Sequence, residues 1–191
     1  MRRRILRALP MLAATLAACG GASTSPAAPT QASPSQAGSP FTLTSPVATD
    51  GGTLPAEYTC DGGGASPALS WSNAPSGTRE FALMMTTLPG DGTTKWNWVL
   101  YAIPPSATGL AKDSSGVGTL GVGSDGPQAA YQPPCSQGPG AKVYTFTLYA
   151  LSAPPALPAS AGQVTGAALT TAIASITLGS ASLKLSYARP Q

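Results

Sequence analysis

The chain has 191 residues, of which 42% are hydrophobic and only 9% are charged, and it contains 22 glycines and 20 prolines. Glycine and proline interrupt helices, and the charged residues that cover exposed helix faces are scarce, so a coiled coil or a helical bundle is excluded. The sequence contains no histidine, which excludes a Ser-His-Asp triad, a Cys-His dyad and any histidine-ligated metal site built from this chain alone.

The basic charge is concentrated at the amino terminus. The formal net charge is +3, but Arg2, Arg3, Arg4 and Arg7 are four of the ten basic residues. The rest of the chain carries 10 − 4 = 6 basic residues against seven acidic ones, a net charge of −1. Six dispersed basic residues form no stripe that could follow a phosphate backbone, so nucleic-acid binding is not expected.

Residues 1–18 have the pattern of an export signal. The arginines precede an apolar stretch over residues 5–16, which is shorter than the roughly 20 residues needed to span a bilayer. The run Leu16-Ala17-Ala18-Cys19 is similar to the bacterial lipobox, in which the cysteine is acylated and becomes the first mature residue. We therefore expect a lipoprotein signal peptide over residues 1–18 and lipidation at Cys19. An ordinary signal peptide that is cut slightly later is the alternative.

Residues 20–40 contain only Gly, Ala, Ser, Thr, Pro and Gln. Such a segment buries too little apolar surface to offset the entropy of ordering, so we expect a disordered tether over residues 19–40. Two or more acyl chains on Cys19 would anchor the protein stably to a membrane. The expected location is the bacterial cell envelope. Because Gly20 and not an aspartate follows the cysteine, the similarity to sorted lipoproteins implies the outer membrane where the cell has two membranes.

Residues 41–191 are expected to form one mainly β domain. Apolar and polar residues alternate over residues 144–150 and 182–187, which is the period of a half-buried strand. Residues 80–87 and 95–103 are apolar on both faces, which is typical of strands covered on both sides.

One helix and two loops complete the expected elements. Apolar residues recur at spacings of three and four between residues 162 and 178, which predicts a single amphipathic helix. The glycine-rich stretches at residues 62–64 and 116–126 are expected to be loops.

Short motifs spread over residues 41–189 resemble the bacterial branch of the phosphatidylethanolamine-binding family, also called Raf kinase inhibitor-like proteins. The most specific are Tyr58-Thr59-Cys60-Asp61-Gly62, Ser66-Pro67-Ala68-Leu69-Ser70-Trp71, Trp96-Asn97-Trp98-Val99, Pro134-Cys135 and Tyr187-Ala188-Arg189. The resemblance implies a β-sandwich with one small peripheral α-helix. It also implies a shallow pocket at one end that takes phosphate-like or carboxylate anions.

The sequence departs from the family's pattern at the residues that would hold the anion. The usual Asp-Pro-Asp-Ala run is replaced by Thr87-Leu88-Pro89-Gly90, and the usual His-Trp pair by Asn97-Trp98. The second pocket histidine of the family aligns with Lys142. An amide and one flexible ammonium thus stand where carboxylate and imidazole groups would orient a phosphate, so the pocket is rebuilt or lost.

Eight residues are candidates for this pocket: Thr87, Pro89, Asn97, Trp98, Tyr131, Pro134, Lys142 and Tyr144. In this hypothesis Lys142 supplies the only charge, while Asn97 donates through its amide and Tyr131 through its hydroxyl. One exposed ammonium contributes at most about 1 kcal/mol, so we expect millimolar binding at best. Alternatively, Lys142 is solvated, Asn97 satisfies backbone groups, and the tyrosines and tryptophans are packing residues.

Two cysteines, Cys60 and Cys135, remain once Cys19 is acylated, which is an even number in an exported protein. Both resemble family cysteines that border the pocket, and the resemblance implies a disulfide between them. Such a bond would join the loop at Cys60 to the loop at Cys135 and so help to shape the pocket. Two free buried thiols are the alternative.

No cofactor or metal is implied, and without histidine or a paired carboxylate site an enzyme is not expected. The expected function is a membrane-tethered, non-catalytic binding module with a rebuilt or lost anion pocket, whose partner is a small anionic ligand or an envelope protein. The alternative is a protein-interaction module, for instance an inhibitor of an envelope enzyme, that uses no pocket chemistry.

Overall fold

The computed structural model describes residues 39–137, 139–158 and 160–190. The expected signal peptide, the lipidation site Cys19 and the tether as far as residue 38 lie outside the described residues. Within the described part of the chain, no helix is both long enough and apolar enough to cross a bilayer.

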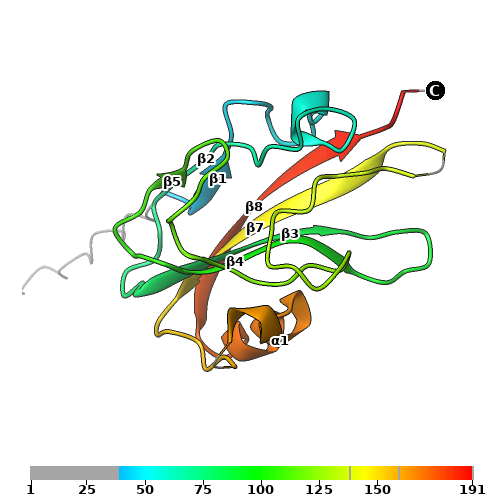
Figure 1. The fold of residues 1–191 in the computed structure, drawn as a ribbon. Helices are drawn as coiled ribbons and strands as arrows, with labels where there is room; N and C mark the ends of the chain where they lie inside the picture. The colour runs from blue at the N-terminus through cyan, green and yellow to red at the C-terminus, as the bar shows by residue number, and fades with distance from the viewer. Residues whose placement is uncertain (1–38, 138, 159, 191) are drawn as a thin grey trace, which may run out of the picture. The chain divides into compact units, whose positions relative to one another are not determined.

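The described residues form two antiparallel β-sheets and one α-helix (Figure 1). The small sheet has the order β1-β2-β5, with β1 at Thr42–Thr44, β2 at Leu69–Ser72 and β5 at Gly109–Leu110. The large sheet has the order β6-β4-β3-β7-β8. Its strands are β3 (Glu80–Thr87), β4 (Lys95–Ile103), β6 (Thr119–Leu120), β7 (Lys142–Leu151) and β8 (Thr177–Tyr187).

The space between the two sheets contains most of the apolar core. The side chains that alternate inward from β7, namely Tyr144, Phe146, Leu148 and Ala150, are all buried. They pack with the inward residues of β8 and with Leu43 and Trp71 of the small sheet. The alternation of apolar and polar residues in the sequence therefore predicts correctly which face of β7 and of β8 is buried, because only one face of each strand meets the small sheet.

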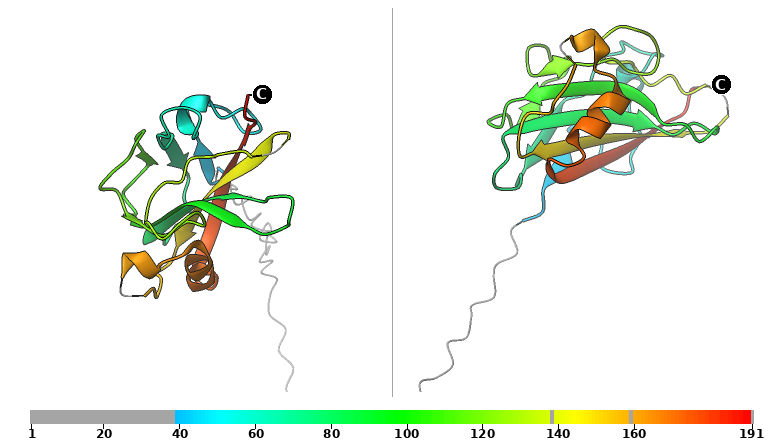
Figure 2. Two further views of the ribbon diagram at one scale, coloured as in Figure 1. Left: turned by 45° about the vertical axis from the view of Figure 1, so that its right-hand side comes forward. Right: turned by 90° about the horizontal axis from the view of Figure 1, so that it is seen from below.

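The helix α1 (Gly166–Ile173) covers part of the other face of the large sheet (Figure 2). A second cluster of buried residues lies there: Ala82, Met84, Val99, Leu151, Val164, Leu169 and Ile173. The central strands β3 and β4 are thus covered on both faces. This explains why their sequences are apolar throughout, and it confirms the predicted bounds at residues 80–87 and 95–103.

The helix is shorter than predicted. It begins at Gly166, where the Thr165 side chain accepts a hydrogen bond from the Ala168 N–H, and it ends at Ile173. Ile176 has the right spacing but follows the helix, and its backbone carbonyl accepts a hydrogen bond from the Ser152 N–H instead. The preceding turn is a short 3-10 helix, η2 (Ala161–Gln163).

Two further corrections concern short elements. The stretch at residues 116–126 is not entirely loop, because β6 pairs there with β4 at Leu100 and Tyr101. The three strands of the small sheet, with two to four residues each, are too short to produce a periodic signal in the sequence. A second 3-10 turn, η1 (Ala56–Tyr58), precedes the Cys60 loop.

Candidate functional site

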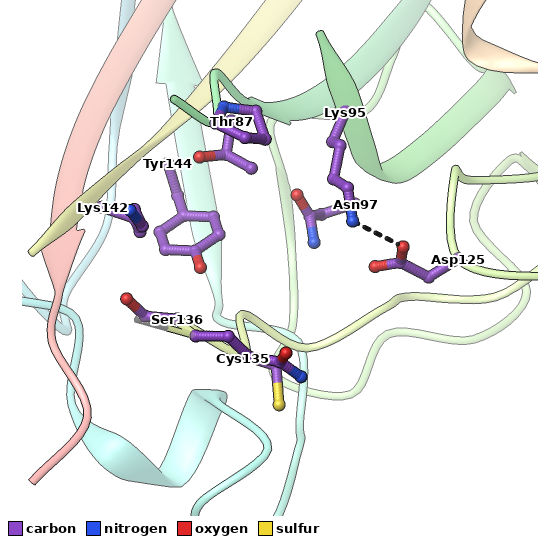
Figure 3. Close-up of a pocket in the computed structure, with 10 residues that line it drawn as sticks. Thr87, Lys95, Asn97, Asp125, Cys135, Ser136, Lys142 and Tyr144 are labelled. Carbon is purple, nitrogen blue, oxygen red and sulfur yellow. Dashed lines mark hydrogen bonds and ion pairs between the residues drawn. The ribbon is translucent and has the colours of Figure 1, made fainter. Parts of the chain in front are cut away.

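A cavity of about 290 Å³ opens at one end of the large sheet, where β3 ends and β4 and β7 begin (Figure 3). Ten residues line it: Thr87, Pro89, Lys95, Asn97, Asp125, Cys135, Ser136, Gln137, Lys142 and Tyr144. The strands contribute side chains at their ends, and the loop between β6 and β7 forms the opposite wall. Five of the eight residues expected at the pocket are among them: Thr87, Pro89, Asn97, Lys142 and Tyr144.

Three charged side chains border the cavity, namely Lys95, Asp125 and Lys142, whereas the sequence analysis expects Lys142 alone. Lys95 Nζ lies 3.0 Å from Asp125 Oδ1, and the two side chains form an ion pair. Lys142 forms no salt bridge with any of the described residues. Two lysines and one aspartate leave a net charge of +1, so Lys142 remains the unbalanced cation of the site.

Asn97 is one of the most deeply buried polar groups of the cavity, with 4% of its surface exposed. Its Nδ2 donates a hydrogen bond of 3.4 Å to the Gln132 carbonyl, and its Oδ1 is buried without a hydrogen-bond partner. This contact uses one of the two N–H groups of the amide, so donation by Asn97 to an anion stays a prediction. The side-chain atom that is left without a partner among the described residues is an acceptor.

The hydroxyl groups of the cavity differ in whether they can serve a ligand. Thr87 Oγ1 donates to the Val143 carbonyl at 2.9 Å, so its proton is used. Burial, and secondarily the carboxylate of Asp125, raises the pKa of Tyr144, so its hydroxyl stays protonated at neutral pH. Ser136 is 2% exposed, and within the described part of the chain its hydroxyl donates only to the Gly140 carbonyl at 3.5 Å, which is a weak contact.

Three of the expected pocket residues lie elsewhere. Trp98 is 1% exposed and belongs to the core, where its ring meets that of Tyr131 edge to face at 5.2 Å. Tyr131 lines a neighbouring cavity, and its hydroxyl donates to the Tyr58 carbonyl at 2.9 Å, so it is not a donor for an anion in the first cavity. Pro134 is buried, and its carbonyl accepts from the Cys60 N–H at 3.1 Å.

The cysteine prediction is confirmed. Cys60 and Cys135 are joined by a disulfide, with their Cα atoms 5.3 Å apart. Cys135 borders both the 290 Å³ cavity and the neighbouring one of about 370 Å³. The disulfide therefore connects the loop after η1 directly to the loop that separates the two cavities.

Asp61, next to the disulfide, is more than the turn residue that its glycine-rich context suggests. Arg189 Nε donates to Asp61 Oδ1 at 2.8 Å, and the Tyr187 hydroxyl donates to Asp61 Oδ2 at 2.7 Å. These donors, Arg189 first, lower the pKa of Asp61. The end of β8 is in this way attached to the Cys60 loop.

Sequence reasoning missed Lys95, Asp125, Ser136 and Gln137 as pocket residues. Lys95 could have been found, because it stands two positions before Asn97 in the same strand and such residues share a face. The other three lie in the loop between β6 and β7, whose path no periodic pattern predicts. Among the described residues, no three Cys, Asp or Glu side chains gather in a way that could hold a metal ion.

Comparison with known proteins places this geometry in a family. Residues 44–188 match the family model "Phosphatidylethanolamine-binding protein". A Mycobacterium tuberculosis protein named "Putative lipoprotein LppC" is 33% identical over 151 residues, which cover 78% of this chain and 73% of that protein. A UPF0098 protein of Methanothermobacter thermautotrophicus is 36% identical over 107 residues, covering 53% of this chain and 70% of that protein.

Solved structures show the same architecture. CT736 of Chlamydia trachomatis, described as a "Putative PhosphatidylEthanolamine-Binding Protein (PEBP) Homolog", superimposes with a TM-score of 0.71 at 25% identity, covering 78% of this chain and 98% of that one. YbcL of Escherichia coli, described as a member of the mammalian PEBP family, gives a TM-score of 0.70 at 24% identity, covering 78% and 99%. From its sequence and its fold, the chain belongs to the phosphatidylethanolamine-binding protein family.

Proposed function

We propose that this protein is a lipid-anchored, non-catalytic binding module that holds a small anion in the 290 Å³ cavity. The observation that supports this most directly is the unpaired state of Lys142 among the described residues. Lys142 is the one cavity lysine without an ionic partner among the described residues, and it borders the same space as the Tyr144 hydroxyl and Ser136. A cation beside hydroxyl donors is the arrangement that a phosphate-like or carboxylate group requires.

The expected affinity is low. Lys95 is already neutralised by Asp125, so a single ammonium acts on the ligand. A partly exposed charge pair contributes about 1 kcal/mol, and each hydroxyl hydrogen bond adds about 1 kcal/mol. With the hydroxyls of Tyr144 and Ser136 these contributions total about 3 kcal/mol, which is near the roughly −4 kcal/mol of a millimolar complex and well short of the −8 kcal/mol that a micromolar one needs.

The residues also support a role without catalysis. The chain has no histidine, and Asp125 is engaged in an ion pair. General base or nucleophilic chemistry at this site would need a group that accepts a proton near neutral pH, and a protonated lysine or a tyrosine with a raised pKa does not do so readily.

The lipid anchor is proposed on two grounds. Leu16-Ala17-Ala18-Cys19 has the lipobox pattern, and a relative that covers most of this chain is named a lipoprotein. We propose that the protein is located in the bacterial cell envelope, and at the outer membrane where the cell has two membranes. Mass spectrometry of membrane-extracted protein tests this proposal: it should find acylated Cys19 as the first residue, and an unmodified terminus beyond residue 20 would contradict it.

Titration of the detergent-solubilised full chain with phosphate and phosphoethanolamine tests the anion site. We expect millimolar dissociation constants that weaken at least several-fold in Lys142→Ala. Lys184→Ala is the matched control, because Lys184 lies on the adjacent strand near Lys142 but does not line the cavity. Equal binding by both variants, or no binding by the wild type, would contradict the proposal.

A protein-binding role is the second candidate, supported by a different surface. Leu88 is 65% exposed and Val143 is 52% exposed, and both line an open groove beside Lys142 and Lys184. Exposed apolar side chains with flanking cations are common at protein interfaces. If an envelope protein binds here, Leu88→Glu should abolish its cross-linking to the anchored chain, whereas phosphate binding should persist.

A further inference from the structure

We propose that Asn97 makes the cavity selective for an oxyanion that carries its own O–H donor, of which hydrogen phosphate is the simplest, over one that carries none, such as sulfate. This inference rests on the proposed anion-binding function and specifies the ligand of the same site. It is carried by a single atom, the unpartnered Oδ1 of Asn97.

The identity of that free atom follows from the contact on the other side of the amide. Gln132 presents a carbonyl oxygen, which can only accept, at 3.4 Å from the Asn97 amide. Only the NH₂ group can face it favourably, so the oxygen is directed to the other side. Figure 3 shows the amide pointing toward the space that Thr87 and Tyr144 border.

No group of the described residues provides a donor for this oxygen. The Thr87 hydroxyl, on the facing strand, donates to the Val143 carbonyl. Lys95, two residues away in β4, is paired with Asp125. A buried acceptor without a donor is unfavourable, and a ligand that brings a donor relieves this cost, whereas a ligand that brings only acceptors adds to it.

The amide can reach a ligand because it is held loosely. The 3.4 Å contact to Gln132 is longer than the 2.7–3.2 Å of a normal N–H···O hydrogen bond. The terminal torsion of asparagine is also broad, so a small rotation brings the buried Oδ1 to a ligand in the cavity while the NH₂ group stays toward Gln132. The Lys142 ammonium would then bind the anionic oxygens of the ligand while Asn97 accepts its proton.

A comparison of sulfate with hydrogen phosphate separates the role of the Lys142 charge from the role of the Asn97 acceptor. Both ions are tetrahedral dianions, and the dianion is the main form of inorganic phosphate at pH 7.5, so they present the same charge to Lys142, but only hydrogen phosphate has an O–H group. Fluorophosphate, in which fluorine replaces that O–H, is a second dianion without a donor. An acceptor at Asn97 distinguishes hydrogen phosphate from both, whereas an NH₂ donor at the same place would not.

The experiment is a titration of the detergent-solubilised full chain at pH 7.5 and constant ionic strength with each ion. Binding is followed by the nuclear magnetic resonance signals of the Asn97 side-chain amide and of the Lys142 backbone amide. We expect hydrogen phosphate to bind about tenfold more tightly than sulfate or fluorophosphate. In Asn97→Leu, which removes the acceptor at similar volume, phosphate binding should fall to the level of sulfate.

Asn73→Gly is the control variant. It removes the other asparagine amide of the described domain, which bonds to the Pro40 carbonyl away from the cavity, and glycine accepts the positive φ of 58° at that position. This variant should keep the tenfold preference. Equal affinities of the wild type for the three ions would overturn the selectivity proposal and leave the anion site standing, whereas no binding of any ion would overturn the anion site itself.

Discussion

The interior between the two sheets and the pocket end of the domain are held together by different kinds of interaction. The interior consists of apolar side chains such as Phe81, Phe146 and Leu183, each exposed by 2% or less. The pocket end depends on specific polar and covalent links: the Cys60–Cys135 disulfide and the contacts of Asp61 with Arg189 and Tyr187. Burial is non-directional, so the interior preserves the fold while the pocket residues change. This difference explains how the chain keeps the family's fold although the residues at its pocket differ from those that the family resemblance implies.

The largest expected effect comes from the interior. Phe146 is fully buried between the sheets, so Phe146→Ala should lower the free energy of unfolding by about 3–5 kcal/mol, measured by urea denaturation. Thr147→Ala, the next residue on the opposite face of β7, should cost less than about 1 kcal/mol. If Phe146→Ala does not fold, Phe146→Leu provides a smaller measurable loss. Equal losses at residues 146 and 147 would contradict the assignment of the two faces.

The next effect tests the covalent link of the pocket end. The double substitution Cys60→Ala, Cys135→Ala should lower the free energy of unfolding by about 2–4 kcal/mol, because 75 residues separate the two cysteines in the sequence. Reductant should lower the wild type's stability and leave the double variant unchanged. Titration of two free thiols in unreduced protein would show that the disulfide is absent.

Gly166 tests how closely the helix packs on the sheet. A Cβ atom at this position would lie 2.1 Å from Trp96 Cγ, so Gly166→Ala must displace α1 or the ring and should cost about 1–3 kcal/mol. Gly162→Ala is the control, since its Cβ would meet only Ser160 Oγ at 3.9 Å. Comparable thermal unfolding of the two variants would rule out this tight contact.

The smallest effect depends on pH and belongs to the pocket end. Because the donors from Arg189 and Tyr187 lower the pKa of Asp61 in the folded state, ionised Asp61 stabilises the fold above the usual aspartate pKa of about 3.9. This contribution is lost as the pH falls from there through the lowered pKa. Asp61→Asn should therefore melt below the wild type at pH 6, and the gap should narrow below about pH 4. A gap that is constant with pH would show that the carboxylate does not act through its charge.

Part of the pocket end could be predicted from single residues. The cysteines were few and resembled those of a family, so their pairing was expected and is found. Lys142, Asn97, Thr87 and Tyr144 follow from the same resemblance and lie together at one cavity. The family resemblance could not reveal which polar atoms of these four residues lack a hydrogen-bond partner. That depends on neighbouring residues from other segments of the chain. Asn97 Oδ1 is the unpartnered atom because the Gln132 carbonyl accepts from the NH₂ group on the other side of the amide.

The sequence by itself determined the elements whose pattern is local. The strands at residues 80–87 and 95–103 and the alternation in β7 and β8 follow from which side chains must be buried, and burial leaves a period in the chain. Only the tertiary structure decided the short strands β1, β2, β5 and β6, where α1 ends, and the membership of Asp125, Ser136 and Gln137 in the cavity. These features depend on contacts between segments far apart in the sequence. Contacts of that kind fix geometry without imposing a repeat on the residues that make them.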